Sequence, residues 1–427
     1  MQGGPSQQRD PIIWCALFAL GFLLLVWHRL GIPSKIYFDE VHYVPAARML
    51  LNMQSANPEH PLFAKEVIAA AIALFGDRPL AWRLPSALFG MLGLYAFGRA
   101  VWWATGRRFA TLAAMLLLVT SFAWFIQSRI AMLDMIMAGL TMAALWQVAV
   151  AANGPARRSR WHLAAAGALF GLALGAKWSA APIAMLPGLT FLALRFRDHG
   201  RRLFTEHATR PIPGIGLWEA ALWLGVVPLA VYWATYLPAF LYAQNPANPI
   251  APIAWHRTML QLQDSVTKLH PYRSIWLDWV VNWRAVWYLY EPIDGAQRGI
   301  LLIGNPFTML AGLPALAWCL WTGLRRGRND ALAFATLYLA ALGLWWVTDK
   351  PIQFYYHYLL PGSFLMACLA LGLDALWSKG EKWRWPPLMA LALAAGMFVW
   401  FYPIISAAEL HEGRNSFVTW MWLASWR

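Results

Sequence analysis

The stretch Tyr37-Phe38-Asp39-Glu40-Val41-His42-Tyr43 follows closely on the first long apolar run of the chain, residues 11–30. It places two adjacent carboxylates and an imidazole where that run ends. Acids this close to hydrocarbon are costly and are retained mainly where they have a function. We therefore interpret Asp39 and Glu40 as a catalytic pair at a membrane surface. The alternative is a solvated pair of loop acids.

The composition around this stretch is that of a membrane protein. Of 427 residues, 60% are hydrophobic and only 13% are charged, whereas soluble proteins carry about 25% charged residues. Crossing the hydrocarbon layer takes roughly 20 apolar residues. The sequence therefore predicts an all-α polytopic membrane protein with about eleven transmembrane helices, near residues 11–30, 80–104, 109–127, 130–152, 161–177, 178–196, 217–240, 299–322, 331–348, 356–377 and 386–404.

The net charge of +14 comes from short basic clusters between the apolar runs. Clusters of this kind are typical of cytoplasmic loops of membrane proteins, so we expect no nucleic-acid partner. With a cytoplasmic N-terminus, eleven crossings place every cluster in the cytoplasm and the C-terminus outside. The clusters are Arg107-Arg108, Arg157-Arg158-Ser159-Arg160, residues 195–210, Arg325-Arg326-Gly327-Arg328 and residues 379–384.

The opposite face is predicted to hold the functional segments of a single domain, residues 1–427. A first external loop, residues 31–79, carries the acids and two short amphipathic helices at residues 44–51 and 62–75. A second, residues 241–298, contains an interfacial helix at residues 253–268 and an aromatic run ending at Glu291. The C-terminal segment, residues 405–427, is expected to lie along the interface, because residues 417–426 are too few to cross again after the last span.

Polar residues of mixed type converge on this outer face, as a reactive site requires. A carboxylate can act as a general base for an acceptor hydroxyl, and cations at helix ends can hold a phosphate. We assign Asp39 and Glu40 to catalysis and expect a phosphate-bearing donor at Arg83, Arg129, Lys65, His60 and Lys177. The other candidates for the acceptor site or cavity are His42, Glu59, His270, Tyr272, Tyr355 and His357, with Lys350 beside them.

Each assignment has an alternative. Arg83 and Arg129 could be interface anchors, Arg129 could pair with Asp134, and Lys177 could mark the end of a span. The histidines, taken singly, could be loop residues. A divalent ion at Glu59, His60 and His270 is a further possibility, although no ligand spacing supports it and no cofactor is required.

Four successive motifs then resemble one family. Phe38-Asp39-Glu40-Val41-His42-Tyr43, residues 60–65, Trp82-Arg83-Leu84-Pro85-Ser86-Ala87 and residues 128–134 are similar to the signatures of the protein O-mannosyltransferases, members of the GT-C glycosyltransferases. Residues 270–274 and 354–361 resemble that family's second external loop and its outer C-terminal span.

The resemblance implies a multispan GT-C fold, a polyprenyl-phosphate-linked sugar donor such as mannose, and inverting transfer to a Ser or Thr hydroxyl of a secreted or periplasmic protein. It implies Asp39 as the base and Arg83 as a contact of the lipid phosphate. Residues 60–65 read His-Pro-Leu-Phe-Ala-Lys where the family has His-Pro-Pro-Leu-Gly-Lys. The short loops indicate a bacterial enzyme of the inner (plasma) membrane with an extracytoplasmic active site.

The alternatives are three other functions. A sister transferase would glycosylate a lipid or glycan acceptor in place of a protein. A secondary transporter would place its charges near the middle of the membrane in paired halves, and no half-repeat is visible. A non-catalytic scaffold would not need acids, imidazoles and cations on one face.

Overall fold

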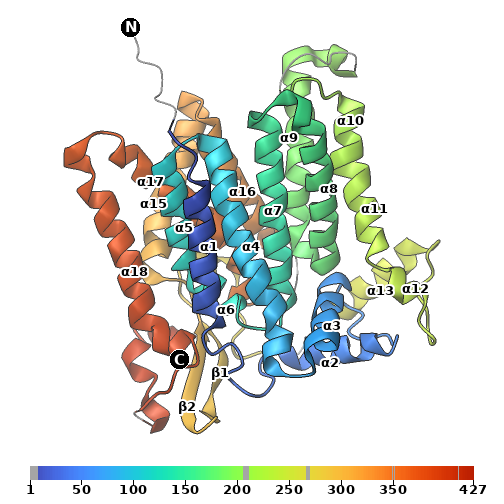
Figure 1. Cartoon of the computed structure of the whole chain (residues 1–427), viewed down its shortest axis with the longest axis vertical. Coiled ribbons are helices and arrows are strands. Elements are labelled where there is room, and N and C mark those ends of the chain that lie inside the picture. The colour runs from blue at the N-terminus through green and yellow to red at the C-terminus, as the bar shows by residue number, and fades with distance from the viewer. Residues whose placement is uncertain (1–7, 205–210, 266–269, 349, 351, 412) are drawn as a thin grey trace.

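The computed structural model describes residues 8–204, 211–265, 270–348, 350, 352–411 and 413–427. A bundle of long helices runs along the vertical axis of Figure 1, and the shorter elements gather at its lower end. The bundle consists of α1 (Ile12–Trp27), α4 (Pro79–Thr105), α5 (Arg108–Val119), α6 (Phe122–Gln127), α7 (Leu133–Asn153), α8 (Ser159–Ala176), α9 (Ala181–His199), α10 (Leu217–Ala221), α11 (Val227–Ala234), α15 (Pro306–Arg326), α16 (Asn329–Val347), α17 (Leu359–Trp377) and α18 (Trp385–Ile405).

A helical segment lies at each of the eleven predicted positions, and the mostly helical multi-pass fold is confirmed. Eight helical segments of the described chain are long and apolar enough to cross a membrane by themselves. The segments at α1, α5 and α8 are not among those eight, and α1 and α5 are shorter than 18 residues. A π-helical turn, Leu222–Val226, joins α10 to α11 into one continuous segment.

Local sequence signals explain where these helices begin and end. Asn305 caps α15 by accepting a hydrogen bond from the Thr308 N–H, and Pro306 occupies the first turn. Gly106 ends α4 and Gly327 ends α15, each in the left-handed conformation that glycine adopts without strain. Both glycines adjoin basic clusters, so the chain turns back at the end of the bundle that carries those clusters.

The helices that carry the site pack closely. A Cβ at Gly139 of α7 would lie 2.4 Å from the Phe89 carbonyl of α4. On α8, the backbone at Gly171 approaches the Pro228 carbonyl of α11 closely enough to exclude a side chain. Small residues at such crossings let membrane helices approach each other. The close crossings fix α7 and α8, whose lower ends carry Asp134 and Lys177.

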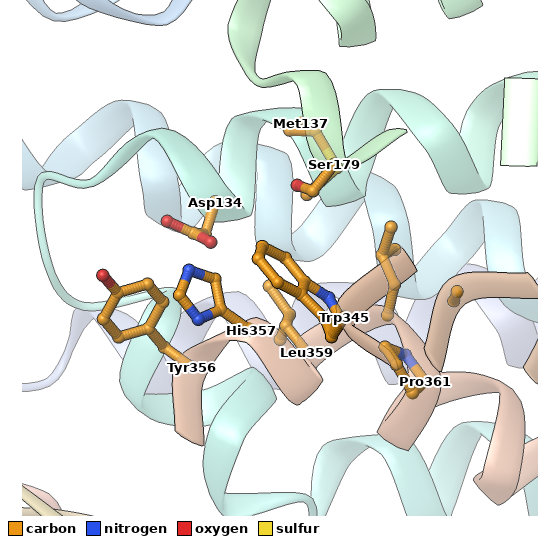
Figure 2. A pocket seen from close by; sticks show the side chains of 10 residues that line it. Asp134, Met137, Ser179, Trp345, Tyr356, His357, Leu359 and Pro361 are labelled. Atoms are coloured by element: carbon orange, nitrogen blue, oxygen red, sulfur yellow. The ribbon is translucent and has the colours of Figure 1, made fainter. Parts of the chain in front are cut away.

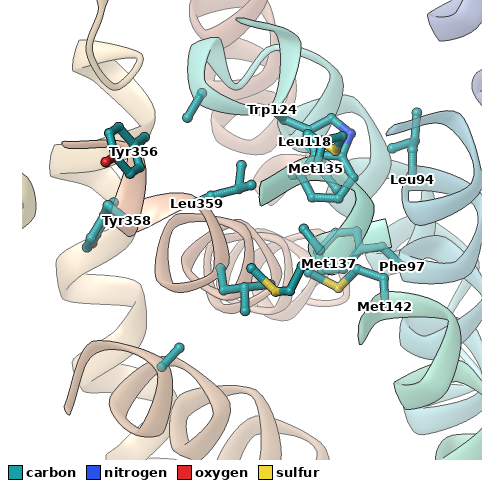
Figure 3. Close-up of a cluster of buried hydrophobic side chains, with 14 of the residues drawn as sticks. Leu94, Phe97, Leu118, Trp124, Met135, Met137, Met142, Tyr356, Tyr358 and Leu359 are labelled. Carbon is teal, nitrogen blue, oxygen red and sulfur yellow. The ribbon is translucent and has the colours of Figure 1, made fainter. Parts of the chain in front are cut away.

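The buried core lies where α4, α5, α6, α7 and α17 meet, as Figure 3 shows. Trp124 is fully buried and donates a hydrogen bond from Nε1 to the Gly90 carbonyl. Met135, Met137 and Leu359 fill the space beside it. This core adjoins the polar residues discussed below, since Met137 and Leu359 also line the pocket beside Asp134.

The lower layer contains α2 (Glu40–Leu51), α3 (Phe63–Phe75), α12 (Leu237–Phe240), α13 (Pro252–Asp264) and α14 (Trp276–Val280), with the hairpin of β1 (Val286–Ile293) and β2 (Ala296–Leu302). The predicted amphipathic helices are confirmed in α2 and α3. The predicted interfacial helix is α13, and residues 266–268 of that prediction lie outside the described residues.

The hairpin is a departure from the all-α prediction. Its strands are antiparallel, with Asp294 and Gly295 in the turn at φ 50° and 77°, and a bulge lies between Trp287 and Leu289. The predicted aromatic run is therefore strand, and the helix expected from residue 299 begins only at Pro306. The Asp-Gly turn between apolar residues is the signal that predicts such a hairpin.

Candidate active site

Asp39 stands at the start of α2 with an unengaged side chain. It occupies the position before the helix, yet its carboxylate makes no capping hydrogen bond, and the described residues supply it with no other donor. Burial raises the pKa of Asp39 to about 6, while the positive charges of Lys177, His42 and Lys350 oppose that rise. An acid with this pKa is ionised near neutral pH and retains useful basicity.

The residue before Asp39 holds a strained conformation. Phe38 has φ 47°, a left-handed conformation that costs a non-glycine residue about 1–2 kcal/mol. Its ring stacks on Tyr288 of β1 at 3.9 Å between centroids. The hydroxyl of Tyr288 in turn accepts a hydrogen bond from Gln127 Nε2 at 3.0 Å. The hairpin and α6 thus hold the backbone that presents Asp39.

Glu40, by contrast, is committed to Arg83. Both side chains are fully buried, with Arg83 Nε 2.8 Å from Oε1 of Glu40 and Nη2 3.0 Å from Oε2. Glu40 also accepts the N–H of Ala131. The remaining Arg83 donors bind the carbonyls of Leu30, Pro33 and Lys35. All five N–H groups of the guanidinium are therefore used, which leaves none for the expected lipid phosphate.

Arg129 is also engaged with the backbone. Its guanidinium donates to the carbonyls of Val26, His28 and Arg29 at 2.6, 2.7 and 3.1 Å. Val26 and His28 stand at the end of α1, where the last carbonyls of a helix need partners. The considered pairing with Asp134 is wrong, because Asp134 binds another cation.

That cation is Lys177. Its Nζ lies 2.8 Å from each oxygen of Asp134, and both side chains are buried. Asp134 stands in the first turn of α7 and Lys177 at the end of α8. The ammonium also lies over the ring of Tyr356 at 5.0 Å. Lys177 therefore belongs to the site, with most of its charge balanced by Asp134.

Lys65 and Glu59 organise the first loop. The Lys65 ammonium donates to the carbonyls of Asn57 and His60 at 2.6 and 2.9 Å, and its pKa is lowered to about 7 by burial. Glu59 accepts from the Asn57 amide. Burial holds the pKa of His60 well below its usual value, and the positive charges of Lys177 and Lys350 add to that effect.

Lys350 is the cation without a local partner. Its ammonium has no hydrogen-bond or ion-pair acceptor among the described residues. Burial lowers its pKa to about 8, Lys177 adds to that effect, and Asp134 and Asp39 oppose it. The charges of Lys177 and Asp134 therefore affect the pKa of Lys350 as well as that of Asp39.

A small pocket lies beside these charges, between α7, α16 and the start of α17 (Figure 2), and its volume of about 10 Å³ is room for about one water molecule or hydroxyl group. His357 contributes its imidazole to the wall, as predicted for a cavity residue. Tyr356 lines the pocket in place of the expected Tyr355, whose hydroxyl donates to Asn282 Oδ1 at 2.9 Å. The complete lining is Asp134, Met137, Ser179, Ala341, Trp345, Tyr356, His357, Leu359, Leu360 and Pro361.

The other predicted residues lie further out. His42 is exposed, and His270 is exposed beside Tyr272 and Phe354, with its ring 5.0 Å from the Phe354 ring. Within the described residues, no group of three or more His, Cys, Asp or Glu side chains is placed to hold a metal ion. The considered set of Glu59, His60 and His270 forms no such group.

Sequence reasoning missed Tyr288, Gln127, Ser179 and Trp345. Tyr356 stands inside a quoted motif, so a signal for it was present. Tyr288, Gln127, Ser179 and Trp345 lie in apolar or aromatic runs on four different elements. Nothing local in the sequence distinguishes these four residues from core residues. Only the fold brings them to the site.

Comparison with known sequences gives a consistent result. A model of the dolichyl-phosphate-mannose-protein mannosyltransferase family matches residues 59–235, and a second model of the same description matches residues 15–82. Together they span just over half of the chain. The polyprenol-phosphate-mannose–protein mannosyltransferase of Mycolicibacterium smegmatis (strain MKD8) is 28% identical over 93% of this chain and 90% of its own length. The Corynebacterium glutamicum protein of the same name is 26% identical over 91% and 88%.

Solved structures show the same fold. The Saccharomyces cerevisiae protein O-mannosyltransferase Pmt1-Pmt2 complex bound to the sugar donor matches with a TM-score of 0.83 at 12% identity, covering 98% of this chain and 93% of that one. ArnT from Cupriavidus metallidurans bound to undecaprenyl phosphate matches with a TM-score of 0.63 at 18% identity, covering 95% and 67%. The fold is that of the GT-C glycosyltransferases. The motifs, the matched models and this fold agree: the chain belongs to the dolichyl-phosphate-mannose-protein mannosyltransferase family and is a membrane glycosyltransferase.

Proposed function

We propose that this protein transfers mannose from a polyprenyl-phosphate donor to Ser or Thr hydroxyls of extracytoplasmic proteins, with inversion and with Asp39 as the general base. One observation carries the assignment of the base. Of the three acids that meet here, Glu40 is paired with Arg83 and Asp134 with Lys177, whereas Asp39 has no partner among the described residues. Named relatives use polyprenol-phosphate-mannose and protein.

The mechanism follows from these positions. Asp39 accepts the proton of the acceptor hydroxyl while the hydroxyl oxygen attacks the anomeric carbon. The bond from that carbon to the phosphate oxygen breaks, and the electron pair leaves with the phosphate. Lys350, supported by Lys177, balances the charge that develops on the leaving phosphate, so it stabilises the transition state more than the ground state. With an ammonium at that place, the reaction as proposed needs no cofactor.

The experiment for the activity is transfer by the purified protein. The protein is incubated with radiolabelled polyprenyl-phosphate mannose, a secreted acceptor protein and a lipid extract. Mannose should appear on Ser or Thr residues of the acceptor protein, with the anomeric configuration opposite to that in the donor. Label in the lipid or glycan fraction alone would support the sister transferase. Absence of label in every fraction would contradict the proposed function.

Lys350→Ala tests the phosphate contact. A charge-assisted hydrogen bond contributes about 1.5–3 kcal/mol, so we expect affinity for polyprenyl phosphate and for the mannose donor to fall together, by roughly 10- to 100-fold. Lys35→Ala is the matched control, because Lys35 lies at the same end of the bundle in an exposed pair with Glu291. Equal affinities of the Lys350 and Lys35 variants would remove Lys350 from this role.

The sidedness is proposed from the charge distribution. Four of the basic clusters lie at the end of the bundle opposite the hairpin. They stand between α4 and α5, between α7 and α8, between α15 and α16, and between α17 and α18. By the positive-inside rule that end faces the cytoplasm and the site faces outward, in a bacterial inner membrane. Reporter tags after Arg326 and after Arg427 should report opposite sides; tags on the same side would refute this orientation.

A further inference from the structure

His357 carries a buried hydrogen-bond donor that no described residue uses. Its Nδ1 accepts the N–H of Phe354 at 3.1 Å, so the proton of the neutral imidazole resides on Nε2. Nε2 is buried and has no hydrogen-bond partner. The side chain is only 5% exposed. A buried polar group left unsatisfied costs about 1–3 kcal/mol, so the position calls for a ligand.

The imidazole is aimed into the pocket beside Asp134. Figure 2 shows a ring nitrogen of His357 turned towards the Asp134 carboxylate, with Ser179 on the far side of the pocket. Close packing against Trp345 holds this orientation, because the centroids of the two tilted rings lie 3.9 Å apart. The donor therefore points at one defined place.

The size and the chemistry of the pocket favour a single uncharged hydroxyl group. Each Asp134 oxygen accepts one hydrogen bond from Lys177 and keeps lone-pair capacity for a hydroxyl. The same carboxylate would repel a phosphate. A group that accepts from His357 and donates to Asp134 is a hydroxyl, and a hexose carries several.

From this juxtaposition we propose that the pocket receives one hydroxyl of the transferred sugar, which accepts from His357 Nε2–H and donates its own proton to Asp134. The inference rests on the proposed function and extends it, since it assigns sugar recognition to this pocket and phosphate recognition to Lys350. The pocket lies close to the proposed base, because the ring of Tyr356, which lines the pocket, packs edge-on against Phe38, the residue before Asp39, with centroids 6.0 Å apart.

Two amide substitutions distinguish the roles of the two ring nitrogens of His357. The oxygen of His357→Asn can take the place of Nδ1 and keep the bond to the Phe354 N–H, but its side chain is too short to act at Nε2. The side-chain amide of His357→Gln reaches the Nε2 position and loses the Phe354 contact. A purely structural histidine would tolerate Asn better, whereas a sugar-binding histidine would tolerate Gln better.

The measurement is the ratio of Kd for polyprenyl phosphate to Kd for polyprenyl-phosphate mannose. We expect His357→Asn to lower this ratio about tenfold, His357→Gln to retain most of it, and Lys350→Ala to weaken both ligands at an unchanged ratio. An unchanged ratio in the Asn variant, as for a pocket that holds only water, would overturn the inference while leaving the activity intact. If the parent protein binds neither ligand, the proposed function fails as well.

Monodeoxymannosyl donors provide a second test that does not depend on the stability of a variant. In the parent protein, removal of the hydroxyl that meets His357 should weaken binding about tenfold. In His357→Asn, if it melts like the parent, that penalty should vanish. Equal binding of every deoxy donor by the parent protein would overturn the inference.

Discussion

Asp39→Asn is expected to lower mannosyl transfer by about 10²–10⁴-fold, the usual contribution of a general base. The amide has nearly the shape of the carboxylate but cannot accept the proton. Because the Asp39 side chain makes no hydrogen bond to the described residues, the variant should melt at the parent temperature and bind the donor normally. Transfer rates, melting temperature and donor affinity check the three parts.

The dependence on pH provides an independent measurement of the same group. Burial raises the pKa of Asp39 to about 6, and only the ionised form accepts a proton. Transfer should therefore rise with pH through about 6 and fall again above about 8, where Lys350 loses the charge that stabilises the leaving phosphate. Loss of the Lys350 charge removes an interaction that lowers this pKa, so the acid limb of Lys350→Ala should move to higher pH. Near-normal transfer by Asp39→Asn would remove Asp39 as the base.

How far the sequence could predict this molecule depends on the range of each interaction. Apolar runs and basic clusters are local signals, and they placed a helix at each expected segment. The hairpin was missed because its strands are aromatic and apolar, as an interfacial segment would be, and the short Asp294-Gly295 turn is a weaker signal than that composition. Strand pairing of residues 286–302 is a tertiary result that local composition does not show.

The site shows the same limit more sharply. The motif placed Asp39 and Glu40 together, but which of them is free depends on Arg83, 43 residues further on. Arg129 stands only five residues before Asp134, yet its guanidinium turns to the end of α1. Asp134 pairs instead with Lys177, again 43 residues away. Proximity in sequence indicated the wrong partner, because Arg129 binds carbonyls at the end of α1 whereas Asp134 binds a side chain at the end of α8.

The buried ion pair of Glu40 and Arg83 has a structural role, and its loss should lower the stability of the folded protein strongly. Arg83→Ala would leave the Glu40 carboxylate buried without its counter-charge and three backbone carbonyls without donors. Breaking a buried ion pair by removing one partner costs about 3–5 kcal/mol. We therefore expect Arg83→Ala to melt far below the parent, and Arg83→Lys to recover little, since an ammonium cannot reproduce the planar fork.

The chain offers a matched control in the same layer of the molecule. Arg48 binds Asp77 through the same two atoms, Nε at 2.8 Å and Nη2 at 3.0 Å, but its side chain is 42% exposed. Exposed pairs contribute about 0–1 kcal/mol, so Arg48→Ala should melt near the parent temperature. The two variants separate burial from geometry. An Arg83→Ala protein that melts like Arg48→Ala but binds polyprenyl phosphate weakly would instead place Arg83 at the phosphate and contradict the structural role.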